Sequence, residues 1–190
     1  MEKEIKELIE RGNIRNALQR YARGVDRRDW TLVSMSYHLD AYDDHGGYKG
    51  GLLGLLKWLE SRHAQIEQSM HFLGNCIIDF LSETVAVVET YCIVYQRYGE
   101  ESFETIQTWL GHEKLPPGKK LMAELSCRYM DRFEQRKGEW RIAWRTVLME
   151  EVKVSAQTVL LKADYELAQR NKNDPLWKAL GQEPPYLSRV

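Results

Sequence analysis

The sequence predicts an α+β fold, in which helices pack on one face of an antiparallel sheet. Apolar residues in the N-terminal third recur at three-to-four spacing, as they do in amphipathic helices. From Met70 to Val154 the pattern changes to long apolar runs joined by turn residues, which indicates a meander of strands. Helices first and strands afterwards are typical of α+β folds. The length of 190 residues suits one domain with a sizeable core.

Three helices are expected before the strands. Residues 2–23 form the first, and Gly24 is its expected C-terminal stop. Asp29 is placed to cap a short second helix over residues 30–37. After a short strand and a Gly-rich turn in HLDAYDDHGGYKG, the segment GLLGLLKWLESRHAQIEQ is expected to form the third helix.

Four long strand signals follow, in the segments HFLGNCIIDFLSE, TVAVVETYCIVYQRY, LMAELSCRYMDRFEQR and EWRIAWRTVLMEEVKV. Lys137-Gly138 indicates a hairpin between the last two, and Ser82-Glu83 a weaker one between the first two. The stretch 99–120 interrupts the strands with a helical turn in SFETIQTWLG and a loop at PPGKK. Residues 155–171 are expected to be helical, before a Pro-containing tail that docks through Trp177 or hangs free.

Several of these strands are apolar on both faces. In Val85 to Val94 nearly every position is hydrophobic. A sheet with helices on one side only would have a polar outer face. We therefore expect another subunit to cover the second face.

Composition argues against several classes of partner. The chain has 27 basic and 28 acidic residues, a net charge of −1, so nothing in its charge favours nucleic acid or an acidic membrane surface. Cys76, Cys92 and Cys127 are odd in number and have no paired spacing, which favours reduced thiols in the cytoplasm. The charged, helical start is not that of a signal peptide, and no apolar run reaches the length of a membrane-spanning helix.

Arg145 is the first residue that points to chemistry. Strand alternation in EWRIAWRTVLM places it in a row with Ala143, Val147 and Met149, and places Trp144 on the opposite face. An arginine in an apolar row is costly to bury unless it is paired or lines a polar cavity. A buried structural ion pair is the simpler of these two interpretations.

His71 and Asp26 form a second candidate. A histidine titrates near neutrality and can abstract a proton, provided that a carboxylate or another group fixes its tautomer. Asp26 could supply that carboxylate, or it could be a helix cap, a role for which Asp29 competes. Alternation aligns His71 with Leu73, Asn75 and Ile77.

The remaining polar residues have plain structural interpretations. Tyr21 and Tyr129 can be core residues with the hydroxyl at an edge. Asp43, Asp44 and His45 could suggest a metal, but they match no metal motif and are more simply solvated turn residues, so no metal site is expected. No phosphate loop, nucleophile elbow or CxxC pair is present in the sequence.

The segments YARGVD, DAYDDHGGYKG, SMHFLGN and RYMDRFEQRKGEWRIAWR together resemble the SnoaL-like branch of the nuclear-transport-factor-2-like superfamily. The resemblance covers about residues 5–155. It implies a cone, formed by a strongly curved antiparallel sheet packed against three N-terminal helices, with a C-terminal helical tail. The expected domain spans 1–172, with an insertion at about 99–120, and 173–190 is the tail. Members of this branch are often dimers or trimers, so the resemblance implies a homodimer or homotrimer.

The resemblance also implies a catalytic set. Hexachlorocyclohexane dehydrochlorinase and bile acid 7α-dehydratase share an Asp–His dyad, which matches Asp26 and His71, and an Arg on the last strand, which matches Arg145. The dehydratase has a Tyr that matches Tyr21, and a pocket aromatic of the family matches Tyr129. A second active-site histidine of the scytalone dehydratase kind is not evident. Substrate is expected to contact the set Tyr129, Asn75, Val147 and Met149.

These matches imply a cofactor-independent lyase of the dehydratase kind, or an isomerase, acting on a hydrophobic cyclic small molecule such as a steroid, polyketide or aromatic compound. Three alternatives remain open. The chain could be a non-catalytic β-type subunit of a ring-hydroxylating dioxygenase, a ligand-binding module without turnover, or a polyketide cyclase that uses an acid as its main catalyst.

Overall fold

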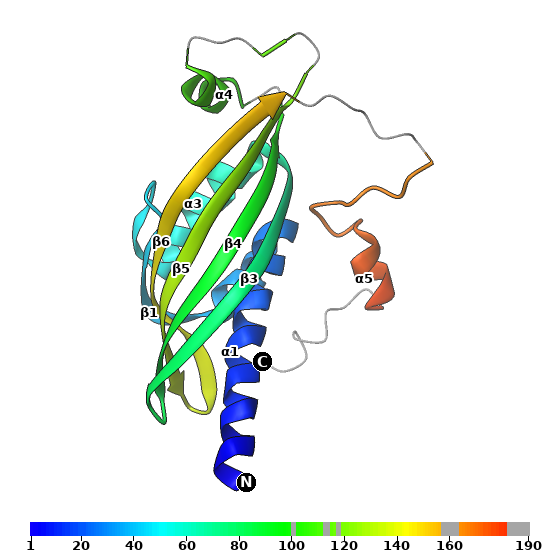
Figure 1. Ribbon diagram of the computed structural model, residues 1–190. Helices are drawn as coiled ribbons and strands as arrows, with labels where there is room; N and C mark the ends of the chain where they lie inside the picture. Colours follow the sequence, from blue (N-terminus) through cyan, green and yellow to red (C-terminus); the bar gives the residue numbers. More distant parts are fainter. Residues whose placement is uncertain (100–101, 112–114, 117–118, 157–163, 182–190) are drawn as a thin grey trace.

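The α+β fold is confirmed in the computed structural model, which describes residues 1–190 except 100–101, 112–114, 117–118, 157–163 and 182–190. A curved sheet packs its concave face against the N-terminal helices (Figure 1). In chain order the elements are α1 (Glu2–Arg27), α2 (Trp30–Met35), β1 (Tyr37–Asp44), β2 (Lys49–Gly51), α3 (Leu52–Ala64), β3 (Ile66–Ser82), β4 (Val85–Tyr98), α4 (Phe103–Leu110), β5 (Leu121–Arg136), β6 (Glu139–Ala156) and α5 (Pro175–Ala179).

The strands form one sheet in the order β2-β1-β6-β5-β4-β3. All neighbours are antiparallel except β1 and β6, which are parallel and so depart from the wholly antiparallel sheet expected. No hairpin joins these two strands, so chain connectivity does not force them to run in opposite directions. The Lys137-Gly138 hairpin is confirmed, and both of its residues have the positive φ angles (54° and 82°) of a tight turn.

The end of α1 differs from the prediction, because the helix continues past Gly24 to Arg27. Arg28 takes the left-handed conformation that ends the helix. Gly24 has a packing role instead: a Cβ there would lie 2.8 Å from Cγ2 of Val33 on α2. The two helices therefore approach closely at Gly24, and Asp26 falls in the last turn of α1. The predicted cap on α2 is confirmed, since Asp29 accepts a hydrogen bond from the Leu32 backbone N–H at 3.1 Å.

The third helix ends four residues earlier than expected, at Ala64. Residues from Ile66 onward belong to β3, where Ile66 pairs with Tyr98 of β4. Ile66 and Tyr98 are both buried in a small second core beneath α4, together with Ile106. The helical turn expected within 99–120 is confirmed as α4.

The helix expected over residues 155–171 is wrong within its described part. Residues 155–156 extend β6, where Ala156 pairs with Leu121, and residues 164–170 are not helical. Residues 157–163 lie outside the described part of the chain. The short helix α5 comes later. Its Trp177 is buried, and Asp174 just before it lies 3.4 Å from Arg27 of α1, so this described part of the tail docks on the body, as one of the two expectations stated.

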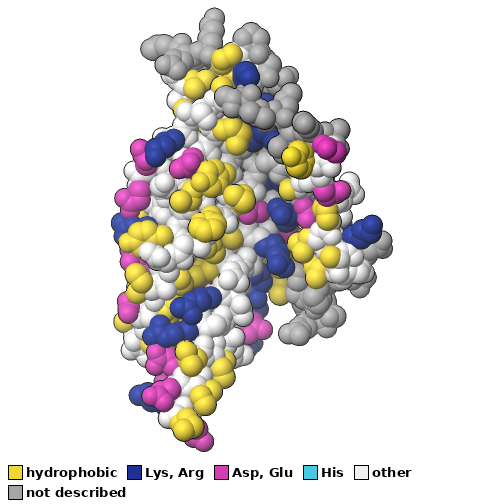
Figure 2. All heavy atoms as spheres, turned by 45° about the vertical axis from the view of Figure 1, so that its right-hand side comes forward, with side chains coloured by type: hydrophobic (Ala, Val, Ile, Leu, Met, Phe, Trp, Pro, Cys, Tyr) yellow, Lys and Arg dark blue, Asp and Glu magenta, His cyan; other side chains and the backbone are white. Residues whose placement is uncertain are grey.

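The outer face of the sheet carries many large apolar side chains. Met70 and Phe72 of β3, Tyr91 and Tyr95 of β4 and Trp144 of β6 are between 38% and 63% exposed. Hydrophobic side chains gather on this face in Figure 2. The outer face therefore carries the apolar side chains that the sequence predicted, together with charged ones such as Arg97 and Arg128. In the single chain only the inner face is covered.

Candidate active site

A cavity of about 170 Å³ lies between the concave face of the sheet and the helices. Five of the residues singled out in the sequence line it: Tyr21, His71, Tyr129, Val147 and Met149. Three other residues of the predicted site do not line the cavity: Asn75, Arg145 and Asp26, the last of which lies behind His71. The cavity brings together side chains from both ends of the chain, because α1 and β6 both border it.

Asp26 and His71 are hydrogen bonded. The Asp26 carboxylate accepts from His71 Nδ1 at 2.7 Å, from the His71 backbone N–H at 2.9 Å and from the Ser69 hydroxyl at 3.0 Å. A carboxylate only accepts, so Nδ1 carries the proton and Nε2 is the nitrogen left for a ligand. Burial lowers the pKa of His71, but the hydrogen bond and charge of Asp26 outweigh it, and the pKa lies above its ordinary value.

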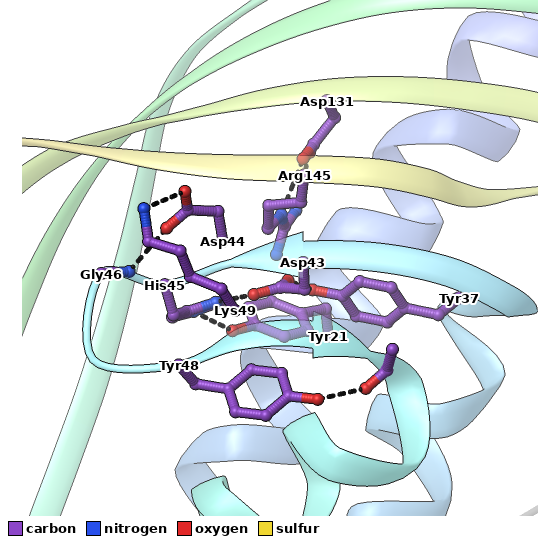
Figure 3. A network of polar contacts seen from close by, with 11 residues as sticks. Tyr21, Tyr37, Asp43, Asp44, His45, Gly46, Tyr48, Lys49, Asp131 and Arg145 are labelled. Atoms are coloured by element: carbon purple, nitrogen blue, oxygen red, sulfur yellow. Dashed lines mark hydrogen bonds and ion pairs between the residues drawn. The ribbon is translucent and has the colours of Figure 1, made fainter.

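A second carboxylate–histidine pair lies on the same cavity. Asp43 accepts a hydrogen bond from His45 Nδ1, and the other nitrogen of His45, Nε2, lies 3.1 Å from the Tyr21 hydroxyl. The Tyr37 hydroxyl holds Asp43 from the far side at 2.7 Å. Figure 3 shows His45 placed between Asp43 and Tyr21, where the β1–β2 turn meets α1. A second histidine that the sequence did not indicate therefore lies on the same cavity as His71.

The sequence analysis missed His45 because it weighed Asp43 and His45 only as metal ligands or as solvated turn residues. Their spacing of two residues was the available signal, since it suits an aspartate and a histidine on one face of an extended segment. Tyr21, between His45 and the ring of His71, is fully buried. Burial raises the pKa of the Tyr21 hydroxyl above its ordinary value, although the nearby positive charge of Arg145 acts against this rise. Tyr21 is therefore a protonated donor at neutral pH.

Arg145 lies behind the cavity wall. Its Nε and Nη2 donate to the two carboxylate oxygens of Asp131, each at 2.7 Å, and both side chains are fully buried. The guanidinium carbon lies 4.4 Å from the ring centre of Tyr21 and 4.2 Å from that of Tyr129, and it is those rings that line the cavity. Its remaining nitrogen, Nη1, is buried and has no hydrogen-bond partner among the described residues.

Asn75 does not face the cavity, which corrects its expected place in the substrate-binding set. A bulge in β3 interrupts the pairing with β4 between Leu73 and Cys76, so strand alternation changes phase there. Asn75 is exposed as a result, while Ile78 rather than Ile77 is buried. A single sequence contains no reliable signal for such a bulge beyond the adjacent glycine.

Arg170, which precedes the tail, lies behind the Asp26–His71 pair. This buried side chain donates to the backbone carbonyls of Asp26 at 2.9 Å, Val25 at 2.8 Å and Ile66 at 2.6 Å. It also lies 2.7 Å from Nδ1 of His63, which lines the cavity. Burial, followed by the positive charge of Arg170, lowers the pKa of His63, so this ring is neutral. No pattern in the sequence indicated the place of either residue.

Within the described part of the chain, no three His, Cys, Asp or Glu side chains are grouped so that they could hold a metal ion. Cys76, Cys92 and Cys127 are free thiols. Among the described helices, none is long and apolar enough to cross a membrane.

The comparisons with known proteins agree with the resemblance seen in the sequence. The family model of the SnoaL-like domain matches residues 6–146. None of the curated proteins shows a significant match to the chain.

Solved structures share the fold at low sequence identity. A scytalone dehydratase candidate from Novosphingobium aromaticivorans DSM 12444 is 19% identical, with a TM-score of 0.63 over 87% of this chain and 94% of its own. Hexachlorocyclohexane dehydrochlorinase LinA-type3 from Novosphingobium barchaimii LL02 is 15% identical, with a TM-score of 0.66 over 84% of this chain and 99% of its own. A candidate aromatic ring hydroxylase from Novosphingobium aromaticivorans DSM is 18% identical, with a TM-score of 0.61 over 79% and 94%.

Proposed function

The chain belongs to the SnoaL-like domain family, and we propose that it is a cofactor-independent lyase of the dehydratase kind, or an isomerase, acting on a hydrophobic cyclic substrate. His71 is the base that removes a proton from carbon, and Asp26 orients it. Two structurally similar proteins carry names of the same chemistry, a dehydrochlorinase and a scytalone dehydratase candidate, which is consistent with an elimination reaction.

One observation carries the proposal: on each side of Tyr21 the cavity has a histidine that is hydrogen bonded to an aspartate. His71 is fixed through Nδ1 by Asp26, and His45 is fixed through Nδ1 by Asp43. A base and an acid placed on one cavity are what an elimination requires, because the proton and the leaving group depart from neighbouring atoms. A module that only binds ligand has no use for two such pairs.

In the proposed reaction, Nε2 of His71 takes the proton from the carbon next to a carbonyl, and Asp26 stabilises the imidazolium that forms. The electron pair moves to the carbonyl oxygen as an enolate. Nδ1 of His45 donates to Asp43, so its Nε2 can accept from the Tyr21 hydroxyl. To act as the acid, this hydroxyl turns from Nε2 to the substrate oxygen. In dehydration, the enolate returns its electron pair, a C=C double bond forms and the carbonyl is restored as the C–O bond to the hydroxyl group breaks. Tyr21 protonates the departing hydroxide, which leaves as water. In isomerisation, Tyr21 stabilises the enolate and the imidazolium returns the proton to another carbon.

Arg145 contributes through the tyrosines in this proposal, and not by touching substrate. Its positive charge makes the Tyr21 hydroxyl a stronger acid than burial alone would leave it, because it acts against the rise in the pKa of that group. Its place over the ring faces of Tyr21 and Tyr129 also fixes both rings. Tyr129, Val147 and Met149 supply the apolar wall that receives the ring system of the substrate.

The test is a turnover screen with cyclic hydroxy-ketones and steroid-like compounds, using the wild type, His71→Ala and, as control, Asn75→Ala. A positioned general base contributes about 10²–10⁴-fold in rate. His71→Ala should lose at least the lower factor with an unchanged circular dichroism spectrum, whereas the exposed Asn75 should be neutral. Full turnover by His71→Ala would rule out the mechanism and favour a cyclase that relies on an acid. Tight binding without turnover by the wild type would favour the binding module.

We further propose that the chain is a homodimer or homotrimer, joined through the exposed apolar side chains on the outer face of the sheet. Phe72, on the edge strand β3, is 63% exposed on that face, and an apolar patch of this kind is typical of an interface. Light scattering after gel filtration should give a mass of two or three chains for the wild type and of one chain for Phe72→Asp. A wild-type mass of one chain would refute this assembly.

A further inference from the structure

We propose that the substrate carries an anionic substituent, a carboxylate in the simplest case, and that Arg62 binds it. The inference rests on the proposed function, because it names the substrate class of the same cavity. Arg62 lies in the last turn of α3, and its side chain lines the cavity in which His71 is held.

The charge of the cavity wall is the first observation. Among the described residues, Arg62 is the one lysine or arginine that lines the cavity, and no aspartate or glutamate lines it. The two aspartates of the site lie behind their histidines. Arg145 is behind the tyrosine rings and is neutralised by Asp131. A ligand in the cavity therefore meets a positive charge with no acidic group beside it.

The partners of Arg62 are the second observation. Its Nη2 donates to the Tyr98 hydroxyl at 3.2 Å and to the Gln96 side-chain oxygen at 3.4 Å, and its guanidinium lies 5.7 Å from the ring centre of Trp58. All three groups are neutral, and no described carboxylate forms an ion pair with Arg62.

Neighbouring arginines of the sheet do have acidic partners: Arg97 lies 2.9 Å from Glu67, and Arg128 lies 2.7 Å from Glu150. A cation in the last turn of a helix also interacts favourably with the helix dipole. That interaction is equally available to a side chain directed to solvent, so it does not explain why Arg62 faces the cavity. A guanidinium that lines a partly buried site without a counter-ion is placed to receive a carboxylate, which it can bind through two parallel hydrogen bonds.

The sheet register sets the distance between this anion and the chemistry. His71 pairs with Val94, and Gln96 lies two residues farther along β4, which corresponds to about 7 Å along the strand. The carboxylate would therefore lie several bonds from the carbon that His71 deprotonates. The apolar side chains of Trp58 and Leu59 line the cavity as well, next to Arg62 on α3. The expected substrate is a hydrophobic ring compound with the reacting centre and the carboxylate on well-separated positions.

The experiment compares the binding of 2-naphthoate and 2-naphthamide, two ligands of nearly equal shape that differ in charge. Isothermal titration calorimetry measures both with the wild type, Arg62→Met and Lys57→Met. Lys57 lies on the exposed side of the same helix, so its loss changes the net charge equally without touching the cavity. The wild type and Lys57→Met should bind 2-naphthoate about tenfold or more tightly than 2-naphthamide, which is the factor expected for a hydrogen bond to a charged group. Arg62→Met should lose this preference.

Arg62→Lys keeps the charge and should keep part of the preference, which guards against a loss caused by misfolding. Raising the salt concentration should weaken the binding of the acid to the wild type and leave the amide unaffected. Equal affinity for the two ligands, binding of neither, or a preference that survives in Arg62→Met would overturn the proposal. Neither ligand reacts, so this outcome is independent of whether His71 is a catalytic base.

Discussion

Asp26→Asn separates the orientation of His71 from the mere presence of its imidazole. The two oxygens of Asp26 accept three hydrogen bonds, two of them from His71 itself and one from Ser69. Oδ2 accepts from the His71 backbone N–H, and Oδ1 accepts from Nδ1 and from the Ser69 hydroxyl. An asparagine has one oxygen and one NH₂ group, so it cannot accept on both sides.

The side-chain amide introduced by Asp26→Asn can adopt two orientations. With its oxygen in the Oδ2 position, it keeps the bond from the His71 backbone N–H, and its NH₂ faces Nδ1. Nδ1 must then accept, so the imidazole proton moves to Nε2. In the reverse orientation, NH₂ and the backbone N–H are two buried donors facing each other, which costs about 1–3 kcal/mol. The first orientation is therefore favoured.

A proton on Nε2 disables the base, so kcat should fall by about 10²–10⁴-fold while the fold is retained. The pKa of His71 should also fall, because burial still lowers it while the bond and charge of Asp26 that raise it are lost. ¹⁵N NMR of the histidine side chains reads both the tautomer and the titration without any substrate. Asp79→Asn, on the exposed face of β3, is the control. A His71 in Asp26→Asn that still carries its proton on Nδ1 and titrates as in the wild type would refute this reasoning.

Three further substitutions test other parts of the site. Tyr21→Phe keeps the ring but removes the proposed proton donor, so kcat should fall by about 10²-fold or more; an unchanged kcat would exclude Tyr21 as the acid. Arg145→Met leaves the buried Asp131 unpaired and should lower the free energy of unfolding in urea by about 3–5 kcal/mol, and adding Asp131→Leu should restore it. An Arg145→Met variant as stable as the wild type would contradict the presence of a buried ion pair. Burial lowers the pKa of His71, Asp26 raises it, and the positive charge of Arg170 lowers it. His71 must be deprotonated to act, so kcat/KM should rise with pH through this pKa. In Arg170→Met the rise should move to higher pH, whereas Arg170→Lys should keep the wild-type profile. The same pH profile in all three proteins would show that Arg170 does not affect the pKa of His71.

The sequence indicated the fold class and the strands because these depend on local patterns. The β5–β6 hairpin shows this most clearly, since long alternating runs flank the turn residues Lys137-Gly138. Asp26 and His71 could be paired in advance through the resemblance, although they are 45 residues apart. Periodicity alone would have ended α1 at Gly24, because a glycine that stops a helix and one that permits close packing look the same in a sequence.

The parts that could not be predicted depend on tertiary contacts. The bulge that turns Asn75 outward depends on how β3 pairs with β4. The place of His45 depends on a turn that brings it to Tyr21. The place of Arg170 depends on its contact with Ile66, which lies 104 residues earlier in the chain. Alternation placed Arg145 in an apolar row, but only the structure reveals that Asp131 holds it behind the tyrosine rings.

The central claim is that His71 removes a proton from carbon. The most direct measurement incubates the wild type and His71→Ala with cyclic hydroxy-ketones in D₂O and follows substrate and product by mass spectrometry, which detects both the loss of water and the uptake of deuterium. The account predicts one or both signals for the wild type and a rate at least about 10²-fold lower for His71→Ala. Equal rates for the two proteins, or compounds that bind tightly to the wild type and return without water loss or deuterium, would contradict it.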